Sequence, residues 1–510
     1  MDNYQEKQEH EAPKPIKLAF WRKVGGGSLS IAIIIHVLLA AAGGIWIAQR
    51  IYQPETKIDF LPGGGKAGGG ERSADSKVQQ KKRAQITPTS SVKRVFAEGA
   101  ASTFSIPDPG DNFGEMSTLS TLAGGGMSGG LGGSGSGGGF GSGQGSGKGL
   151  GMGGGSGKLF EGIPETMRKR CSKEDRLTRL KDSGGTPACD EAVLKGLRWL
   201  KANQSPDGSW GTNFKPAMTG LALLAYFGHC ETPISEEFGE SCTKGIVYLV
   251  NIGVKNDGKL ASVTGNPWVY EHGIATYALG EATTFCKELK VEVPNLTDVT
   301  QKAGQYIIDH QHPNGGWAYA FAVDEKGHTD TSVVGWQLQA LKACSHTGLA
   351  FKGLDKAVKR GLEYLATCQS KDGSFGYVAP GQGTSLTGVG TLCYQMWGKA
   401  KSVEARHGAK FIKDNFKLDW NTQDSDLYSH YYASQAMMQA GGSEWTSYNK
   451  MFRDQLLDNQ NPDGSWKVPA RVGSTNGDDV MRNALCTLML EVYYRFLASS
   501  GGGQSKLPDI

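Results

Sequence analysis

A short turn motif recurs along the C-terminal two thirds of the chain and limits what the chain can fold into. The first copy, QSPDGSWG, occupies residues 204–211. Close copies follow as QHPNGGWAY at residues 311–319, QSKDGSFGY at residues 369–377 and NQNPDGSWKV at residues 459–468. A weaker copy contains Gly258, and a gap around Asp419 and Trp420 has room for a sixth. Spacings of roughly 45 to 60 residues predict stacked supersecondary units.

The segments that flank each copy predict two helices per unit. Residues 191–204 carry apolar side chains at Val193, Leu197 and Leu200, the spacing of a helix with one buried face. Residues 217–228 are apolar almost throughout, which predicts a helix buried on most sides. Pro, Asp and Gly between them are typical of a turn, and the aromatic residue that follows is expected to pack between helices. Each unit is therefore predicted to be a hairpin of an outer and an inner helix.

Six such hairpins are predicted. Their outer and inner helices are expected to begin near Glu191/Ala217, Cys242/Tyr270, Thr297/Asp330, Leu354/Ser385, Val403/Asp426 and Trp445/Asp478. Six inner helices surrounded by six outer helices predict an all-α fold, a closed (α/α)6 toroid over residues 188–497. The repeats resemble the QW motifs of the terpenoid (squalene) cyclase and protein prenyltransferase β-subunit toroids, and the resemblance covers this whole segment.

The same connectivity places all six inner-helix N-termini at one mouth of the ring, where they favour acidic caps or anionic ligands. Acidic residues occur at the predicted starts: Glu271, Asp330, Asp426, Asp478 and Asp479. N-capping is the alternative to a functional role for each of them. At Asp330 the helix dipole is expected to lower the pKa, which would make this residue a poor acid at neutral pH.

Polar and aromatic residues near these starts predict a ligand pocket with aromatic walls. The candidate ligand-binding residues are Trp268, Tyr270, His272, Asp330, Thr331, Trp336, Tyr428 and His430. Each could instead belong to the core, and His272 and His430 in particular could be core histidines with satisfied hydrogen bonds. The expected ligand is hydrophobic or isoprenoid.

The resemblance does not carry over the family's catalytic residues. Squalene cyclases protonate their substrate with the central acid of a D-x-D-D-T motif, which matches residues 327–331 here. Asp330 and Thr331 fit the last two positions, but Gly327 and Thr329 replace the first and the central Asp. The Asp-x-Cys zinc ligands of the prenyltransferases are also missing, so neither a metal nor another cofactor is expected.

The N-terminal part predicts a membrane anchor. Residues 29–48 carry no formal charge and would form a helix of roughly 30 Å, which matches a bilayer core. Basic residues precede this run, so we expect residues 1–24 to be a cytoplasmic tail, residues 25–50 a single-pass signal anchor and the toroid to be extracytoplasmic, periplasmic in a diderm bacterium. A cleaved signal peptide is the alternative.

His36 lies inside the predicted span, where ionisable residues are costly. The anchor is weakly similar to TonB-type energy-transducing anchors, although Ser30 lies six residues before His36 and Ala32 holds the expected Ser position. An inner-membrane complex through His36 is one interpretation, and a neutral histidine on a packing face is the other.

The remaining segments are predicted from composition. Of the 34 residues 124–157, 21 are glycine, so we expect residues 51–160 to be a disordered linker. Residues 161–187 form a basic lead-in, and residues 498–510 a disordered tail. The net charge of +4 is too small to indicate a nucleic-acid partner.

Nine cysteines outside the cytoplasm predict disulfides. The expected pairs are Cys171 with Cys189 and Cys230 with Cys242, and a third candidate is Cys286 with Cys344.

The leading functional interpretation is therefore a membrane-anchored, extracytoplasmic toroid that binds a ligand or partner without cyclase chemistry. One alternative is a squalene or terpene cyclase-like enzyme that uses Asp330, Asp478 or Asp479 as the acid. Another is a scaffold coupled to a TonB-type system.

Overall fold

The computed structural model describes residues 94–96, 103–105, 167, 170–262, 267–381, 384–471 and 473–495. The expected cytoplasmic tail, the anchor with His36, most of the linker and the C-terminal tail lie outside these residues. Within them, no helix has both the length and the apolar character needed to cross a bilayer. Strand β1 (Arg94–Phe96) pairs antiparallel with β2 (Thr103–Ser105). These six residues fall in the range 51–160 that the sequence predicts to be a linker.

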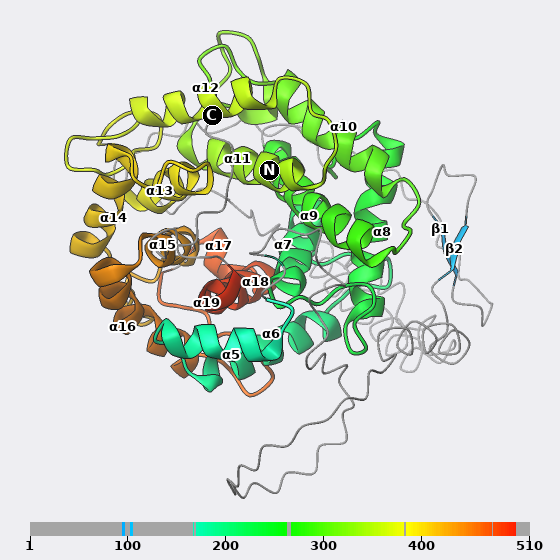
Figure 1. Ribbon diagram of the computed structural model, residues 1–510, viewed down its shortest axis with the longest axis horizontal. Helices are drawn as coiled ribbons and strands as arrows, with labels where there is room; N and C mark the ends of the chain where they lie inside the picture. The colour runs from blue at the N-terminus through cyan, green and yellow to red at the C-terminus, as the bar shows by residue number, and fades with distance from the viewer. Residues whose placement is uncertain are drawn as a thin grey trace, which may run out of the picture. The chain divides into compact units, whose positions relative to one another are not determined.

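The toroid is built from six helical hairpins (Figure 1). The outer helices are α6 (Pro187–Ala202), α8 (Gly239–Lys255), α10 (Leu296–Asp309), α12 (Leu354–Thr367), α14 (Val403–Asn415) and α16 (Gly442–Asp458). The inner helices are α7 (Lys215–Gly228), α9 (Trp268–Leu289), α11 (Thr331–His346), α13 (Thr387–Met396), α15 (Leu427–Ala440) and α18 (Asp479–Leu490). Every predicted helix start lies within a few residues of the observed one.

The inner helices form a closed ring. Each contacts the next along the chain, and α18 contacts α7, which joins the last hairpin to the first. Each outer helix packs against its own inner helix and the preceding one; α6, for example, contacts both α7 and α18. The predicted all-α toroid is confirmed.

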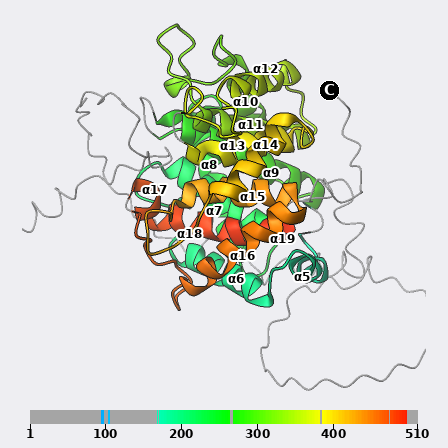
Figure 2. The same cartoon turned by 90° about the vertical axis from the view of Figure 1, so that its left-hand side faces the viewer.

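Short elements complete this part of the chain. Helix α5 (Lys173–Asp182) precedes the ring and packs on α19 (Val492–Arg495), which follows it. The other short elements are η1 (Tyr319–Phe321), η2 (Thr384–Leu386) and α17 (Ser474–Gly477). Figure 2 shows α5 and α17 on opposite sides of the ring. Because α17 directly precedes inner helix α18, it lies on the side of the mouth.

The glycine of each turn lies directly against the next outer helix. Gly208, Gly258, Gly315, Gly373 and Gly464 all have φ between 87° and 96°. A Cβ at Gly208 would lie 2.5 Å from the Lys244 carbonyl oxygen in α8, and one at Gly464 would lie 2.2 Å from that of Lys195 in α6. Only glycine fits both the left-handed backbone and this close approach. A Cβ at Gly258 would lie 2.4 Å from Lys302 Cβ in α10, so the weaker copy also approaches the next outer helix closely.

The glutamine that begins each close copy bridges two hairpins. The Gln204 side chain donates to the Gly208 carbonyl in its own turn and to the Ser241 carbonyl in α8, both at 2.9 Å. Gln311 and Gln369 make the equivalent bonds to α12 and α14. Gln460 donates to the Ala192 carbonyl of α6 at 2.8 Å. The last close copy therefore connects the final hairpin to the first.

The aromatic residue of each close copy is a wedge between hairpins, as predicted. Trp210, Trp317, Phe375 and Trp466 are fully buried. They pack against glycines of the next outer helix, which are Gly245, Gly361, Gly408 and Gly196 respectively. Each indole also donates to a carbonyl of its own outer helix, as Trp317 does to Ile307 at 2.7 Å. The sixth turn differs: the backbone N–H of Trp420 donates to Gln455 of α16 at 2.8 Å.

The disulfide prediction is wrong in its pairing. Cys171 is bonded to Cys230, 59 residues away, and Cys189 and Cys242 are free and buried. Cys189 lies inside α6 with its side chain in the core, whereas the end of α7 carries Cys230 to the segment that precedes α5. The third candidate pair, Cys286 and Cys344, is also unbonded.

Candidate functional site

Three acidic residues at the mouth cap inner helices. Asp330, Asp426 and Asp478 accept hydrogen bonds from the backbone N–H groups three residues ahead, at 2.9, 3.3 and 2.8 Å. These bonds confirm N-capping as one role for each acid. Burial raises the pKa of Asp426 and of Asp478, so at these two helix starts the loss of water outweighs the helix dipole.

The other two acids at the mouth are not caps. Glu271 lies inside the first turn of α9, fully buried, and accepts from the backbone N–H and the hydroxyl of Ser262 at 3.1 and 2.6 Å. Asp479 forms an ion pair with Arg482, and its side chain is 68% exposed. Neither carboxylate is placed to act on a ligand inside the ring.

A chain of hydroxyl groups leads from the surface of the mouth to Asp330. The phenol oxygens of Tyr377 and Tyr319 are 2.8 Å apart, and those of Tyr319 and Tyr270 are 3.0 Å apart. Tyr270 in turn lies 2.9 Å from the Ser332 hydroxyl, which donates to Asp330 Oδ1 at 2.6 Å. Tyr319 and Tyr377 are half-buried, whereas the other three residues are buried. The chain thus joins the protein surface to an interior carboxylate.

The interior beside Asp330 holds several buried polar atoms that form no hydrogen bond within the described part of the chain. They are Asp330 Oδ2, the Tyr428 and Tyr432 hydroxyls and Trp336 Nε1. The Trp336 ring centre lies 5.5 Å from that of Tyr432 and 6.4 Å from that of Tyr428. Burial, and then the Asp330 carboxylate, raise the pKa of Tyr270, so this phenol is neutral at physiological pH. An acidic group with aromatic neighbours therefore stands at the inner end of the hydroxyl chain.

His272 and Trp268 do not belong to this cluster. His272 Nδ1 accepts from the backbone N–H of Leu260 at 3.0 Å, so its Nε2–H donates to the Ala303 carbonyl of α10, also at 3.0 Å. Burial lowers the pKa of His272 to about 3. Trp268 packs on His272 and on Tyr306 of α10. Both side chains thus contact an outer helix, as the core alternative expects.

His430 and Thr331 are also structural. His430 Nε2 donates to the Lys417 carbonyl and Nδ1 accepts from Tyr448 of outer helix α16, both at 2.8 Å. Burial lowers the pKa of His430 to about 4. Thr331 donates to the Gly376 carbonyl at 2.8 Å. Of the eight predicted ligand-binding residues, the structure therefore brings together Tyr270, Asp330, Trp336 and Tyr428.

Thr329, which stands where the cyclase motif has its central acid, has a structural role. The Thr329 hydroxyl accepts from the Asn314 side chain at 2.8 Å, which ties the start of α11 to the preceding turn. A threonine hydroxyl engaged in this way cannot replace a carboxylic acid as proton donor.

The sequence analysis missed Tyr319, Tyr377 and Ser332. A signal for the first two exists, because each tyrosine follows the turn aromatic by two residues in its copy, in the segments WAY and FGY. The first and last close copies have Thr212 and Val468 there. Ser332 has no distinguishing local pattern, since its role depends on the position of Tyr270 in another hairpin.

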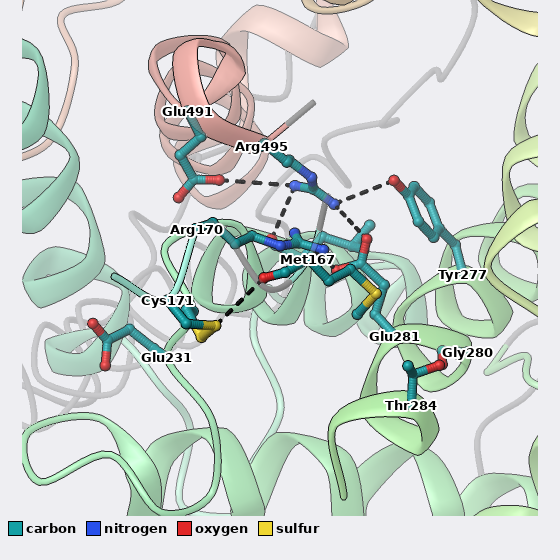
Figure 3. A network of polar contacts seen from close by, with 12 residues as sticks. Met167, Arg170, Cys171, Glu231, Tyr277, Gly280, Glu281, Thr284, Glu491 and Arg495 are labelled. Carbon is teal, nitrogen blue, oxygen red and sulfur yellow. Dashed lines mark hydrogen bonds and ion pairs between the residues drawn. A yellow bond between two sulfur atoms is a disulfide. The ribbon is translucent and has the colours of Figure 1, made fainter. Parts of the chain in front are cut away.

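The opposite end of the ring interior is closed by a buried charge network (Figure 3). The guanidinium groups of Arg170 and Arg495 both reach Glu281 of α9, at 3.3 and 3.1 Å. Arg495 also donates to the Tyr277 hydroxyl at 3.2 Å and lies 3.8 Å from Glu491. Burial raises the pKa of Glu491 well above its ordinary value. Because Arg170 precedes α5, the lead-in segment itself helps to close this end.

The described residues contain no group of histidines, cysteines and acids that could hold a metal ion. A surface hollow lined by Gln301, Gln305 and Phe351 lies on the outside of the ring, away from the candidate site.

The closed ring of hairpins and the bridging turns define the class of fold, an α/α toroid of QW-type repeats. No protein-family model matches the chain. It is 24% identical over 217 residues to the squalene–hopene cyclase of Bradyrhizobium diazoefficiens, and 27% identical over 201 residues to that of Alicyclobacillus acidocaldarius. These matches cover 39% and 36% of this chain and 32% and 28% of the relatives, so the chain matches about a third of their length. Together with the repeat geometry they identify a terpenoid cyclase-like α/α toroid.

Two solved structures that resemble this chain weakly carry the names of two different enzymes. The α-1,6-mannanase GH76A of Salegentibacter sp. HEL1_6 has a TM-score of 0.46 at 10% identity, covering 60% of this chain and 98% of its own. The type II terpene cyclase MstE from Scytonema has a TM-score of 0.40 at 12% identity, covering 60% and 98%. At these scores the similarity assigns no activity to this chain.

Proposed function

We propose that the chain is a membrane-anchored, extracytoplasmic toroid that binds a ligand or partner at its mouth and does not perform cyclase chemistry. The observation that carries this proposal is the state of the acids. Thr329 stands where the central proton donor would be and is engaged by Asn314. Asp426 and Asp478 cap helices, and Asp479 is largely exposed and paired with Arg482.

A direct test is to incubate the purified protein with squalene and with shorter polyprenyl substrates, and to analyse the extracts by gas chromatography and mass spectrometry. We expect no cyclised product. Native mass spectrometry of the same preparation, followed by extraction of any bound molecule, should reveal a retained ligand. A cyclised product that disappears in Asp330→Asn would overturn the proposal, because asparagine keeps the cap but cannot supply the proton.

A terpene cyclase-like activity is the second candidate, and one observation favours it. Asp330 is fully buried among aromatic side chains, and its Oδ2 makes no hydrogen bond to the described residues. A carboxyl group in such surroundings can become a general acid. Asp478 and Asp479 have no comparable setting, because Asp478 is a cap and Asp479 is solvated.

The proposed anchor and location are supported by the uncharged run at residues 29–48 and by the basic residues before it. The Cys171–Cys230 disulfide also favours an oxidising compartment. A C-terminal fusion to a reporter that is active only in the cytoplasm should give no signal. A bright fusion would reverse the proposed topology.

A further inference from the structure

The three capping aspartates at the mouth differ in how the charge of each carboxylate is compensated. Asp426 Oδ2 lies 3.6 Å from the Arg471 guanidinium. Asp478 is only half-buried, so its carboxylate keeps contact with water, and the neighbouring Asp479 repels it more than Arg482 attracts it. Asp330 forms no ion pair with any described residue, although it is the most deeply buried of the three. An interior carboxylate without a counter-charge is costly, because burial removes its hydration and the two hydrogen bonds to Oδ1 replace only part of the lost attraction.

The surroundings of Asp330 are suited to a cation. Ser332 and the backbone N–H of Val333 occupy Oδ1, which leaves Oδ2 as the acceptor without a partner. Tyr270 is joined to Asp330 through Ser332, and burial, with a smaller contribution from the Asp330 carboxylate, raises the pKa of Tyr428. The faces of aromatic rings attract cations, and a desolvated site strengthens that attraction. An apolar or hydroxylated ligand would add no positive charge, so it would leave the buried carboxylate uncompensated.

We propose that the mouth binds a molecule with an ammonium group, and that this group pairs with Asp330 Oδ2 between the rings of Tyr270, Trp336 and Tyr428. The inference rests on the proposed function and names the chemical class of its ligand. The ammonium supplies the counter-charge that Arg471 supplies to Asp426. The remainder of the ligand lies toward the surface of the mouth.

Tyr319 controls the route to this site. Its hydroxyl bridges those of Tyr270 and Tyr377, and its ring stacks on the exposed His328 at 5.5 Å. The next residues, Ala320 and Phe321, have φ of 53° and 52°, a left-handed backbone that side chains rarely adopt. Residues 323–326, which follow, are exposed. Displacement of Tyr319 with this loop opens a path along the hydroxyl chain, so Tyr319 is a positioning residue.

The test uses two probes of nearly equal shape, choline and its neutral carbon analogue 3,3-dimethylbutan-1-ol, with ethylammonium as a smaller cation. Binding to the full-length protein is measured by isothermal titration calorimetry at constant ionic strength, with sodium chloride as the blank. Choline or ethylammonium should bind saturably, and the neutral analogue should bind at least about tenfold more weakly, since it lacks the charge. Tyr319→Phe removes one hydroxyl from the chain, and the association rate, measured by stopped-flow tryptophan fluorescence, should change more than the affinity; an unchanged rate would argue against a role of Tyr319 in access.

Two variants decide whether Asp330 is responsible. Asp330→Asn keeps the cap and removes the charge, so it should reduce ammonium binding at least about tenfold while the unfolding midpoint changes little. Asp426→Asn is the matched control, because it alters an equivalent cap that already has Arg471, and binding should persist. Equal affinity for choline and the neutral analogue, unchanged binding in Asp330→Asn, or no saturable binding of either cation would overturn the inference. A neutral lipid found by native mass spectrometry with no ammonium binding would leave the proposed function intact, whereas a cyclised polyprenyl product would remove the proposed function itself.

Discussion

Gly464 lies so close to α6 that ring closure should depend on the absence of a side chain at this position. Replacing Gly464 by alanine would put a Cβ 2.2 Å from the Lys195 carbonyl oxygen and 2.6 Å from its carbonyl carbon. Both are backbone atoms, so no side chain can rotate away. Gly398 is a matched control, because its φ is 77° and a Cβ there would meet nothing within 4 Å.

Both substitutions place an alanine in a left-handed backbone, with φ of 92° at Gly464 and 77° at Gly398, and they differ in the contact. A left-handed backbone costs an alanine about 1–2 kcal/mol relative to glycine. Reduced freedom of the unfolded chain offsets about 0.4–1 kcal/mol of this. Gly398→Ala should therefore lower the free energy of unfolding by about 0–1.6 kcal/mol. Overpacking adds about 1–3 kcal/mol at Gly464, which gives a total of about 1–4.6 kcal/mol.

Urea unfolding of the purified protein, followed by near-ultraviolet circular dichroism of the buried tryptophans, measures both values. Gly464→Ala should shift the midpoint well below that of Gly398→Ala, with a similar slope. Equal losses in the two variants would refute the reasoning, because they would show that the approach of the fourth close turn to α6 contributes nothing beyond backbone strain.

Three further predictions follow from the packing, the disulfide and the buried histidines. Trp317→Phe should lower the free energy of unfolding by about 1–3 kcal/mol, because the Ile307 carbonyl loses its buried donor. Trp317→Ala should lower it by about 3–5 kcal/mol. An equal loss in the two variants would contradict the hydrogen-bond contribution. Non-reducing peptide mapping should recover Cys171 linked to Cys230, with Cys189 and Cys242 labelled only after unfolding. The variant in which both bonded cysteines are replaced by serine should lose about 4 kcal/mol of its free energy of unfolding, as expected for a loop of this length. Burial lowers the pKa values of His272 and His430 to about 3 and about 4, so both side chains are neutral in the fold. Their contribution to the free energy of unfolding is complete above pH 6.5. It is lost as the pH falls from there toward 4, because the unfolded chain binds protons that the folded chain does not. Urea midpoints between pH 7 and 4.5 should show this decline, and His430→Gln should make it shallower; an unchanged slope would argue against the assignment.

The fold could be predicted from the sequence because its determinants are local and repeated. The turn glycines, the bridging glutamines and the wedge aromatics all lie within a few residues of one another in each copy. The Gln460 side chain donates a hydrogen bond to a carbonyl of the first hairpin, as the Gln204 side chain does to a carbonyl of the second. Closure of the ring therefore required no information beyond the repeat itself.

The candidate site could be predicted only in part, since it depends on contacts between hairpins. Asp330 and Tyr270 are recognisable at helix starts, but nothing local separates Tyr428, which faces the interior, from His430, which faces α16. The disulfide was mispaired for the same reason. Cys171 is closer to Cys189 along the chain than to Cys230, and only the packing of α5 across the end of the ring reverses that preference.

The Cys171–Cys230 bond also changes how the toroid would carry a mechanical load. The bond closes a covalent loop that contains α5, α6 and α7, the complete first hairpin. A pull on the chain before Cys171 passes through the sulfur atoms directly to the end of α7. The 58 residues inside the loop bear no tension, so the hairpin that Gln460 and Trp466 hold in place cannot be drawn out of the ring from that side. Reduction of the bond would transfer the same pull to α5 and then to α6, where the last hairpin joins the first.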